Sequence, residues 1–243
     1  AHTRPTREQA SLPPVSSNDT SPTVTCEIHD SVALVKMDDG RANAISEQTL
    51  GDFHAALDDA KGASALVIAG RPGKFCAGFD LSVMQQGPEA AVAMMNRGGE
   101  LSLRLHEWPT PRVIASTGHA LAMGAVLLAC GDLRIGARGS FKYGLNEVAI
   151  GLALPKFAIE LHRPRMATRE LHQATVLSKI YDPEGALAAG FLDELVEADA
   201  VVDHAVSRAS ELADYLDATA FVQTRLTAYR ELTEYLRQKF GGS

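Results

Sequence analysis

The arrangement of apolar and polar residues predicts alternating strands and helices over most of the chain. Two runs rich in β-branched residues lie within Val24–Met37 and are separated by Asp30 and Ser31, which predicts a β-hairpin. Ser46 then precedes apolar residues at helical spacing, so we expect a capped helix that continues to about Lys61. Three short, largely apolar runs predict buried strands: 65–69, 112–117 and 133–137.

Helical patterns occupy much of the remaining sequence. A long helix is expected over Glu89–Glu107, because the following Trp108–Pro109 stops it. We interpret residues 70–81 as a loop, and 118–123 as a turn into an apolar helix that ends at Cys130. Two short helices are expected over 156–176, and one or two longer helices over 199–239. Strands that alternate with helices favour an α/β fold with largely parallel pairing.

The same patterns divide the chain into three parts. Residues 1–22 are rich in Ser, Thr and Pro with few large apolar side chains, which is typical of a flexible arm. Residues 23–190 carry the predicted α/β core, and residues 191–243 are predicted to form a helical C-terminal region.

Composition and charge exclude several classes of protein. The chain has 243 residues, is 46% hydrophobic and has a formal net charge of −7, which disfavours a basic surface for nucleic acid. The longest apolar stretch, 120–130, is too short to span a bilayer. Three scattered cysteines and no secretory leader indicate a reduced, cytoplasmic setting. The eight histidines show no metal-binding spacing, so we expect no metal.

Two sharp turns after predicted strands are candidates for chemistry. One is CAGFD, 76–80, and the other is GHALAMG, 118–124. In α/β proteins, ligands bind where parallel strands end and helices begin, because backbone N–H groups point outward there. Two such groups that converge on one oxygen form an oxyanion hole. The alternative is that both turns only connect structural elements.

Glu147 is the third candidate, because it lies in the almost wholly apolar stretch FKYGLNEVAIGLALP, 141–155. We expect neighbours such as Val148, Ile150 and Leu152 to exclude water and so to raise the pKa of its carboxyl toward the range of a general base. With two N–H donors, such a base could remove a proton α to a carbonyl. The alternative is an exposed helix cap.

Other reactive side chains have simpler interpretations. Cys76 and Cys130 are expected to be small core residues rather than nucleophiles, because no base lies near them in sequence. His119 stands alone at a turn and is interpreted as structural or solvated.

Four segments in order resemble the crotonase (enoyl-CoA hydratase/isomerase) superfamily: GRANAI (40–45), KFCAGFDL (74–81), GHALAMGAVLLACGDLRIGA (118–137) and FKYGLNEVAIGLALP. The resemblance implies a ββα spiral core with a helical C-terminal trimerisation region, and a homotrimer or a dimer of trimers. It also implies an acyl-CoA thioester substrate, with coenzyme A as part of the substrate and no separate cofactor.

The resemblance also assigns roles to residues. The backbone N–H groups of Phe79 and Met123 would form the oxyanion hole, and Glu147 would be the catalytic acid/base. The CoA-binding positions implied are Arg41, Lys74, Ala77 and Gly78.

Two positions depart from the hydratase pattern. Hydratases usually have glycines at 122–124, where this chain has Ala122, Met123 and Gly124, and they carry a second catalytic glutamate where this chain has Val126. Mitochondrial-type Δ3,Δ2-enoyl-CoA isomerases also lack that glutamate and have a similar GLNE turn. The resemblance therefore predicts isomerisation of 3-enoyl-CoA to 2-enoyl-CoA in fatty-acid metabolism.

Two alternatives to the isomerase stay open. A 2-enoyl-CoA hydratase would need a replacement carboxylate, for which Asp80 and Glu100 are the nearest candidates in sequence. A non-catalytic acyl-CoA-binding scaffold is suggested by Met123 in the oxyanion turn.

Overall fold

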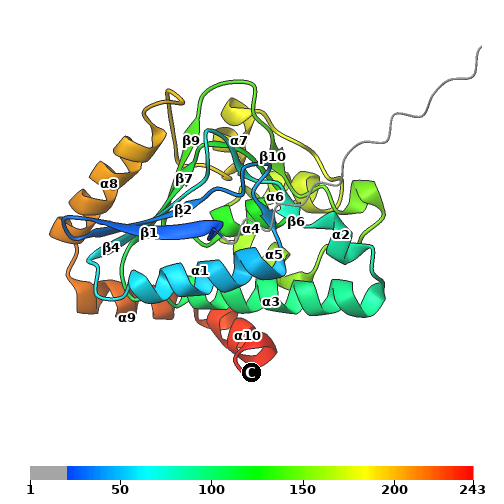
Figure 1. The fold of residues 1–243 in the computed structure, drawn as a ribbon, viewed down its shortest axis with the longest axis horizontal. Coiled ribbons are helices and arrows are strands. Elements are labelled where there is room, and N and C mark those ends of the chain that lie inside the picture. Colours follow the sequence, from blue (N-terminus) through cyan, green and yellow to red (C-terminus); the bar gives the residue numbers. More distant parts are fainter. Residues whose placement is uncertain (1–20, 243) are drawn as a thin grey trace, which may run out of the picture.

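The computed structural model describes residues 21–242, so the predicted arm of residues 1–22 lies outside the described residues except for Ser21 and Pro22. The architecture is α/β, as predicted (Figure 1). Its main sheet has six strands in the order β1-β2-β4-β7-β9-β11. The bounds are Val24–His29, Val32–Met37, Ala65–Ala69, Arg112–Ser116, Leu133–Ala137 and Glu194–Val196.

The predicted hairpin and the predicted parallel core are both confirmed. Strands β1 and β2 pair antiparallel, from Val24 opposite Met37 to His29 opposite Val32, and Asp30 turns the chain with φ 54°. Asp tolerates this left-handed conformation better than most residues. The pairs β2–β4, β4–β7, β7–β9 and β9–β11 are all parallel. Strand β11 joins the sheet from the segment after residue 190.

The inner strands β2, β4, β7 and β9 of the main sheet are buried on both faces, which explains their continuous apolar runs. In β4, Leu66 and Ile68 face one core cluster, while Ala65 and Val67 face the other. Helix α8 (Val201–Tyr215) packs on β2, β4, β7 and β9 on the second face. The larger cluster lies on the opposite face and involves α1 (Glu47–Asp59), α3 (Pro88–His106) and α4 (Met123–Ala129).

A second, three-stranded sheet corrects two expectations. Its order is β10-β8-β5, and both pairs are parallel. Its strands are Tyr143–Gly144, Gly118–Leu121 and Gly73–Cys76, and a further two-stranded sheet pairs β3 (Ala44–Ile45) with β6 (Gly78–Phe79). The expected loop at 70–81 and turn at 118–123 are therefore wrong in part. These strands are too short for an alternating pattern to be visible.

The helices follow the prediction most closely where they are amphipathic. Ser46 caps α1 by accepting a hydrogen bond from Thr49 N, and α3 agrees with its predicted limits to within one residue. The two short helices after Pro155 are confirmed as α5 (Lys156–His162) and α6 (Thr168–Thr175). Helices α2 (Leu81–Met84) and α7 (Pro183–Ala189) were not predicted.

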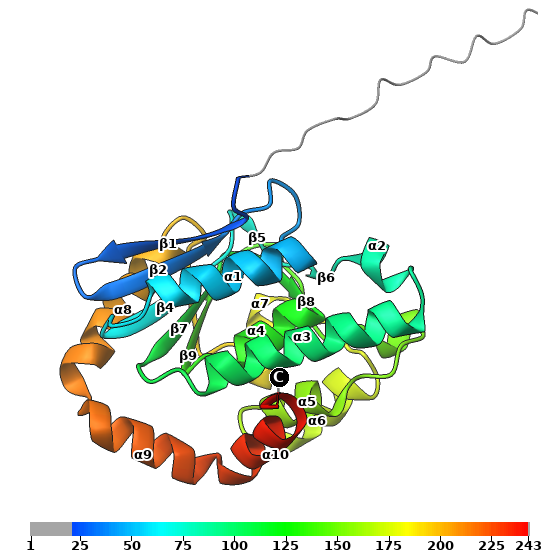
Figure 2. The same ribbon diagram turned by 60° about the horizontal axis from the view of Figure 1, so that its bottom comes forward.

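The C-terminal region has three helices, where one or two were expected over 199–239. They are α8, α9 (Ala218–Ala228) and α10 (Arg230–Phe240). Figure 2 shows them as an arc that leaves the main sheet and returns beneath α3. Across residues 21–242, no helix is both long enough and apolar enough to cross a membrane.

Candidate active site

The carboxyl ends of the three parallel strands β5, β8 and β10 gather the predicted site segments. Strand β5 leads to Cys76–Phe79, β8 leads to Ala122 and Met123, and β10 leads to Glu147. The third segment is tied to the second, because Ala122 N donates a hydrogen bond of 2.9 Å to Gly144 O. The sheet therefore brings together three segments that are far apart in the sequence.

The first two segments are in direct contact at Gly78. This residue has φ +105°, and a Cβ built on it would lie 2.8 Å from the Ala122 Cβ and 3.6 Å from the Met123 N. A larger residue at 78 would need an unfavourable backbone conformation and would push the Ala122 turn away. Glycine at 78 thus allows the backbone of 78–79 to approach the N–H of Met123.

The start of α4 has an unusual backbone. Ala122 precedes the helix with φ 50° and ψ −121°, a region that L-residues rarely occupy. Met123 is the first residue of the helix, so its N–H has no acceptor within the helix. A Cβ at Gly124 would lie 2.2 Å from Cys76 O, so the helix start is packed closely against the end of β5.

The side chains of Phe79 and Met123 meet on helix α3. A Cβ built on Gly98 would lie 2.5 Å from the Phe79 Cζ and 3.3 Å from the Met123 Sδ. Met123 is 1% exposed, and Phe79 is half-buried. Sequence reasoning missed Gly98, although a Gly-Gly pair inside a predicted helix is a signal, because glycine disfavours helix interiors.

Glu147 directly precedes the short 3₁₀ helix Val148–Ile150 and is half-buried. Its Oε2 atom is fully buried and accepts no hydrogen bond from residues 21–242. Burial raises the pKa of its carboxyl above the ordinary value of a glutamate, and its own backbone N–H opposes that shift. The carboxylate is therefore held without a cation, as expected for an acid/base group.

The expected source of that burial is wrong. Val148, Ile150 and Leu152 are 45%, 55% and 42% exposed, so these neighbours in sequence point outward. The adjacent Ala149 N donates to the Ser178 Oγ at 3.2 Å, which fixes this segment against the loop after α6. The single 3₁₀ turn directs the apolar residues away from the core while the Glu147 carboxylate stays inside.

The two candidates for a second carboxylate interact with other parts of the structure. Asp80 caps α2, since its Oδ1 accepts a 2.8 Å hydrogen bond from Ser82 N. Glu100 acts electrostatically on His54 of α1, so it lies on the α1 side of α3. Val126 itself is 2% exposed and belongs to the larger core cluster.

The predicted CoA-binding residues fall into two groups. Gly78 is buried in the site, as described, whereas Arg41, Lys74 and Ala77 are exposed. Asn43, which was not singled out from the sequence, ties the Arg41 loop to β5, because its Nδ2 donates to Lys74 O at 3.0 Å and to Phe75 O at 3.2 Å. Arg41 and Lys74 thus belong to adjoining segments.

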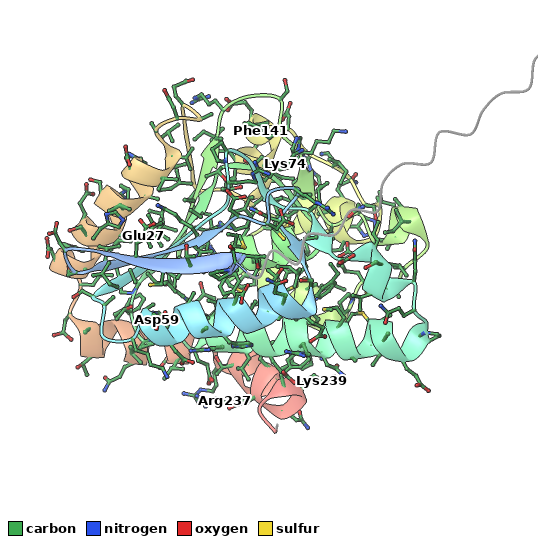
Figure 3. The ribbon with its side chains drawn as sticks, viewed as in Figure 1. Glu27, Asp59, Lys74, Phe141, Arg237 and Lys239 are labelled. Carbon is green, nitrogen blue, oxygen red and sulfur yellow. The ribbon has the colours of Figure 1, made fainter. Side chains whose placement is uncertain are left out.

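His119 has a structural environment, as interpreted from the sequence. Its Nδ1 accepts a 3.0 Å hydrogen bond from Lys142 N, and its ring meets Phe141 edge-on at 5.5 Å. Burial, followed by the charges of Lys74 and Lys142, lowers its pKa. In Figure 3, Lys74 and Phe141 lie near each other in the upper part of the view, consistent with the pairing of Lys74 with His119 and the contact of His119 with Phe141.

The cysteines also match their interpretation as core residues. All three are free, and burial raises the pKa of both Cys76 and Cys130 to about 12, so neither is a thiolate at neutral pH. Among residues 21–242, no group of three or more His, Cys, Asp or Glu side chains could hold a metal ion.

Comparison with known proteins gives this site a family. The chain is 30% identical to "Enoyl-CoA delta isomerase 1, mitochondrial" of Mus musculus over 176 residues, which cover 70% of this chain and 61% of the mouse protein. A solved structure described as an Mtb enoyl-CoA isomerase is 38% identical, with a TM-score of 0.85 over 91% of this chain and 97% of the other.

A solved structure that is described as a hydratase is equally similar. A structure described as an enoyl-CoA hydratase from Mycobacterium marinum is 39% identical, with a TM-score of 0.85 over 90% of this chain and 97% of the other. The family profile described as "Enoyl-CoA hydratase/isomerase" matches residues 27–240. The predicted crotonase-type fold is therefore confirmed, and the chain belongs to the enoyl-CoA hydratase/isomerase family.

Proposed function

We propose that this member of the family is an enoyl-CoA isomerase that converts 3-enoyl-CoA to 2-enoyl-CoA with Glu147 as its only acid/base. The observation that carries the proposal is the buried Oε2 of Glu147, which has no hydrogen-bond partner among residues 21–242, combined with the buried Val126 where hydratases have a glutamate. Isomerisation moves one proton, so one carboxylate is sufficient. Hydration must both position and activate a water molecule, which normally uses two.

In the proposed reaction, the thioester oxygen accepts hydrogen bonds from the N–H groups of Phe79 and Met123. Glu147 removes a proton from C2, the electron pair passes through the dienolate, and the protonated Glu147 returns the proton to C4. Negative charge on the thioester oxygen is stabilised by the two donors, each worth about 10²–10³ in rate. The raised pKa of Glu147 suits both halves of this transfer.

Substrate binding is proposed to use the exposed cations and the backbone of the first turn. Arg41 and Lys74 would lie near the CoA phosphates, and Ala77 and Gly78 would line the path of the coenzyme. The reaction needs no cofactor, because coenzyme A belongs to the substrate. In a chain of net charge −7, these cations supply the local positive charge that a polyanion requires.

The assembly proposed is a homotrimer or a dimer of trimers. Two segments that the Ala149–Ser178 hydrogen bond ties together carry exposed apolar side chains and support association: Val148, Ile150, Leu152, Val176, Leu177 and Ile180. Isolated apolar residues are normal on a protein surface, whereas groups of them mark interfaces. A cytoplasmic setting is also proposed, and the three free cysteines support it.

The decisive experiment separates isomerase from hydratase by product. Purified protein is incubated with trans-3-hexenoyl-CoA and, separately, with trans-2-hexenoyl-CoA, and the products are resolved by chromatography with mass detection. We expect 2-enoyl-CoA in the first reaction and no 3-hydroxyacyl-CoA in either. Formation of 3-hydroxyacyl-CoA would instead favour the hydratase. Several relatives are described as hydratases.

The role of Glu147 is tested by Glu147→Gln, which keeps the size of the side chain but cannot accept a proton. We expect turnover to fall by about 10³ or more, while the affinity for a saturated acyl-CoA is unchanged. The matched control is Glu89→Gln, which makes the same chemical change at an exposed position in the first turn of α3. If the wild-type protein bound acyl-CoA tightly but converted no substrate, the non-catalytic acyl-CoA-binding scaffold would be favoured.

A further inference from the structure

We propose that the side chains of Met123 and Phe79, seated on Gly98, close the acyl site on the α3 side, so that this protein prefers short-chain acyl thioesters. The proposal deepens the proposed function and rests on it, because it takes the N–H groups of the same two residues as the site of the thioester oxygen.

The position of the thioester makes these side chains neighbours of the acyl chain. If the carbonyl oxygen is held by the N–H groups of Phe79 and Met123, the first carbons of the acyl chain begin within reach of the side chains of both residues. The contact between Gly78 and the Ala122–Met123 turn keeps the two segments together. Larger side chains at positions 79 and 123 therefore leave less space for the acyl chain.

The side chains of Met123 and Phe79 fill the space between the candidate site and helix α3. The Met123 side chain is 1% exposed and the Phe79 ring is half-buried. Both reach Gly98, since a Cβ there would lie 2.5 Å from the Phe79 Cζ and 3.3 Å from the Met123 Sδ. Met94, one turn earlier on α3, is fully buried. A long acyl chain directed toward α3 would have to displace packed side chains.

The composition of this wall also determines which ligand it accepts. The thioether of Met123 and the ring of Phe79 are apolar, so an unsubstituted hydrocarbon chain is favoured over a polar one. Gly98 is essential to the arrangement, because any side chain at that position would push the Phe79 ring and the Met123 sulfur into the site. The wall thus limits the acyl chain by size rather than by hydrogen bonding.

The test compares two chain lengths in turnover and in binding. Values of kcat/KM are measured for trans-3-hexenoyl-CoA and trans-3-dodecenoyl-CoA, and dissociation constants are measured by calorimetry for butanoyl-CoA and decanoyl-CoA. We expect the wild type to favour the shorter substrate. Met123→Ala should raise the ratio of long-chain to short-chain kcat/KM by about tenfold, the discrimination that one or two methylenes give in an apolar pocket.

Two further variants separate this role from a general loss of packing. Gly98→Ala should lower the same ratio, since it displaces the ring and the sulfur toward the ligand. Met166→Ala truncates another buried methionine, which is 7% exposed and lies beside Gly190, away from the site. It should reduce stability without changing the ratio. If Gly98→Ala does not fold, Met123→Ala and Met166→Ala still form a complete comparison.

The outcomes distinguish this inference from the proposed function. A shift in the acyl-CoA binding ratio of Met123→Ala supports the inference even if no 3-enoyl-CoA is isomerised, in which case the proposed function alone fails. Equal use of both chain lengths by the wild type would overturn the inference. So would the same shift in Met123→Ala and Met166→Ala, or no shift in Met123→Ala, whatever reaction the protein catalyses.

Discussion

Two regions of this molecule bury carboxylates, and they treat them in opposite ways. Beneath the C-terminal helices, Asp132 is held by Arg112 through bonds of 2.6 and 3.0 Å from its side chain and 2.9 Å from its backbone N–H. Arg225 of α9 approaches the same carboxylate at 3.6 Å. We call these three residues the C-terminal charge network. At the candidate site, Glu147 has no such partner among the described residues.

The pKa values of the two carboxyls express this difference. Burial alone would raise the pKa of Asp132, but Arg112 and Arg225 outweigh it and hold that pKa below the ordinary value. Burial also raises the pKa of Glu147, and no cation opposes it. Ion pairs therefore anchor α9 to the core, whereas the Glu147 carboxylate is left without a cation, as the proposed proton transfer requires. A buried acid indicates chemistry only when its charge is left uncompensated.

The largest expected effect comes from breaking the C-terminal charge network. Asp132→Asn leaves Arg112 and Arg225 buried without a counter-charge, so the free energy of unfolding should fall by about 3–5 kcal/mol at pH 7. Because the folded pKa of Asp132 is depressed, its contribution is present above its unfolded value of about 3.9 and is lost as pH falls through the folded value. Urea unfolding at pH 7 and pH 3 measures both effects.

The contrast between Asp132 and Glu147 would be contradicted if Asp132→Asn lowered the free energy of unfolding by less than about 1 kcal/mol at pH 7. That is the range of an exposed ion pair. Asp193→Asn provides a second case, since Asp193 forms a similar pair with the buried Arg134 at 2.8 Å. A large cost at both positions would show that paired carboxylates in this fold are structural.

At the candidate site, we expect the free energy of unfolding to depend on pH in the opposite direction. The pKa of Glu147 is raised in the folded state, so the favourable term is present below its unfolded value of about 4.3 and is lost as pH rises through the folded value. Glu147→Gln should therefore increase the free energy of unfolding by roughly 1 kcal/mol at pH 8, with no difference below about pH 4. Thermal or urea unfolding across this pH range checks it. A loss of stability at pH 8 would place Glu147 with the structural carboxylates.

The smallest expected effect concerns the backbone strain at Ala122, beside the candidate site. Ala122 adopts φ 50° and ψ −121° next to the proposed donor Met123, which costs about 1–3 kcal/mol for a residue with a Cβ. Ala122→Gly should stabilise the fold by about 1 kcal/mol, after the greater freedom of glycine in the unfolded chain is subtracted. Chemical denaturation measures this change. Destabilisation would mean that the Ala122 methyl contributes packing against Gly78 that outweighs the strain.

The sequence was sufficient for the elements whose patterns are local. The Ser46 cap, the hairpin around Asp30 and the buried run 65–69 each carry their own signal. Strands β5, β8 and β10 do not, because they have two to four residues and exist only through partners elsewhere in the chain. The direction of Val148 and Ile150 was likewise unpredictable, since it depends on a 3₁₀ turn anchored by Ser178.

The candidate site shows the same division. The identity of Glu147, Phe79 and Met123 as candidates followed from ordered motifs in the sequence, and the sheet brings their segments to one edge. The role of Gly98 could only come from the structure, because its neighbours Phe79 and Met123 are brought to it by other elements. Contacts between distant segments are what a single sequence does not reveal.

The packing of Phe240 on helix α3 ties the last helix, α10, to the core. The ring lies against Gly99, where a Cβ would be only 2.3 Å from it, and meets Phe157 edge-on at 5.3 Å. The next residue along α3 toward its N-terminus is Gly98, at the candidate site. A chain truncated before residue 240 would leave Gly99 and Phe157 without this ring and would expose apolar surface on α3. The two adjacent glycines of α3 thus serve different neighbours, since Gly98 accommodates Phe79 and Met123 whereas Gly99 accommodates Phe240.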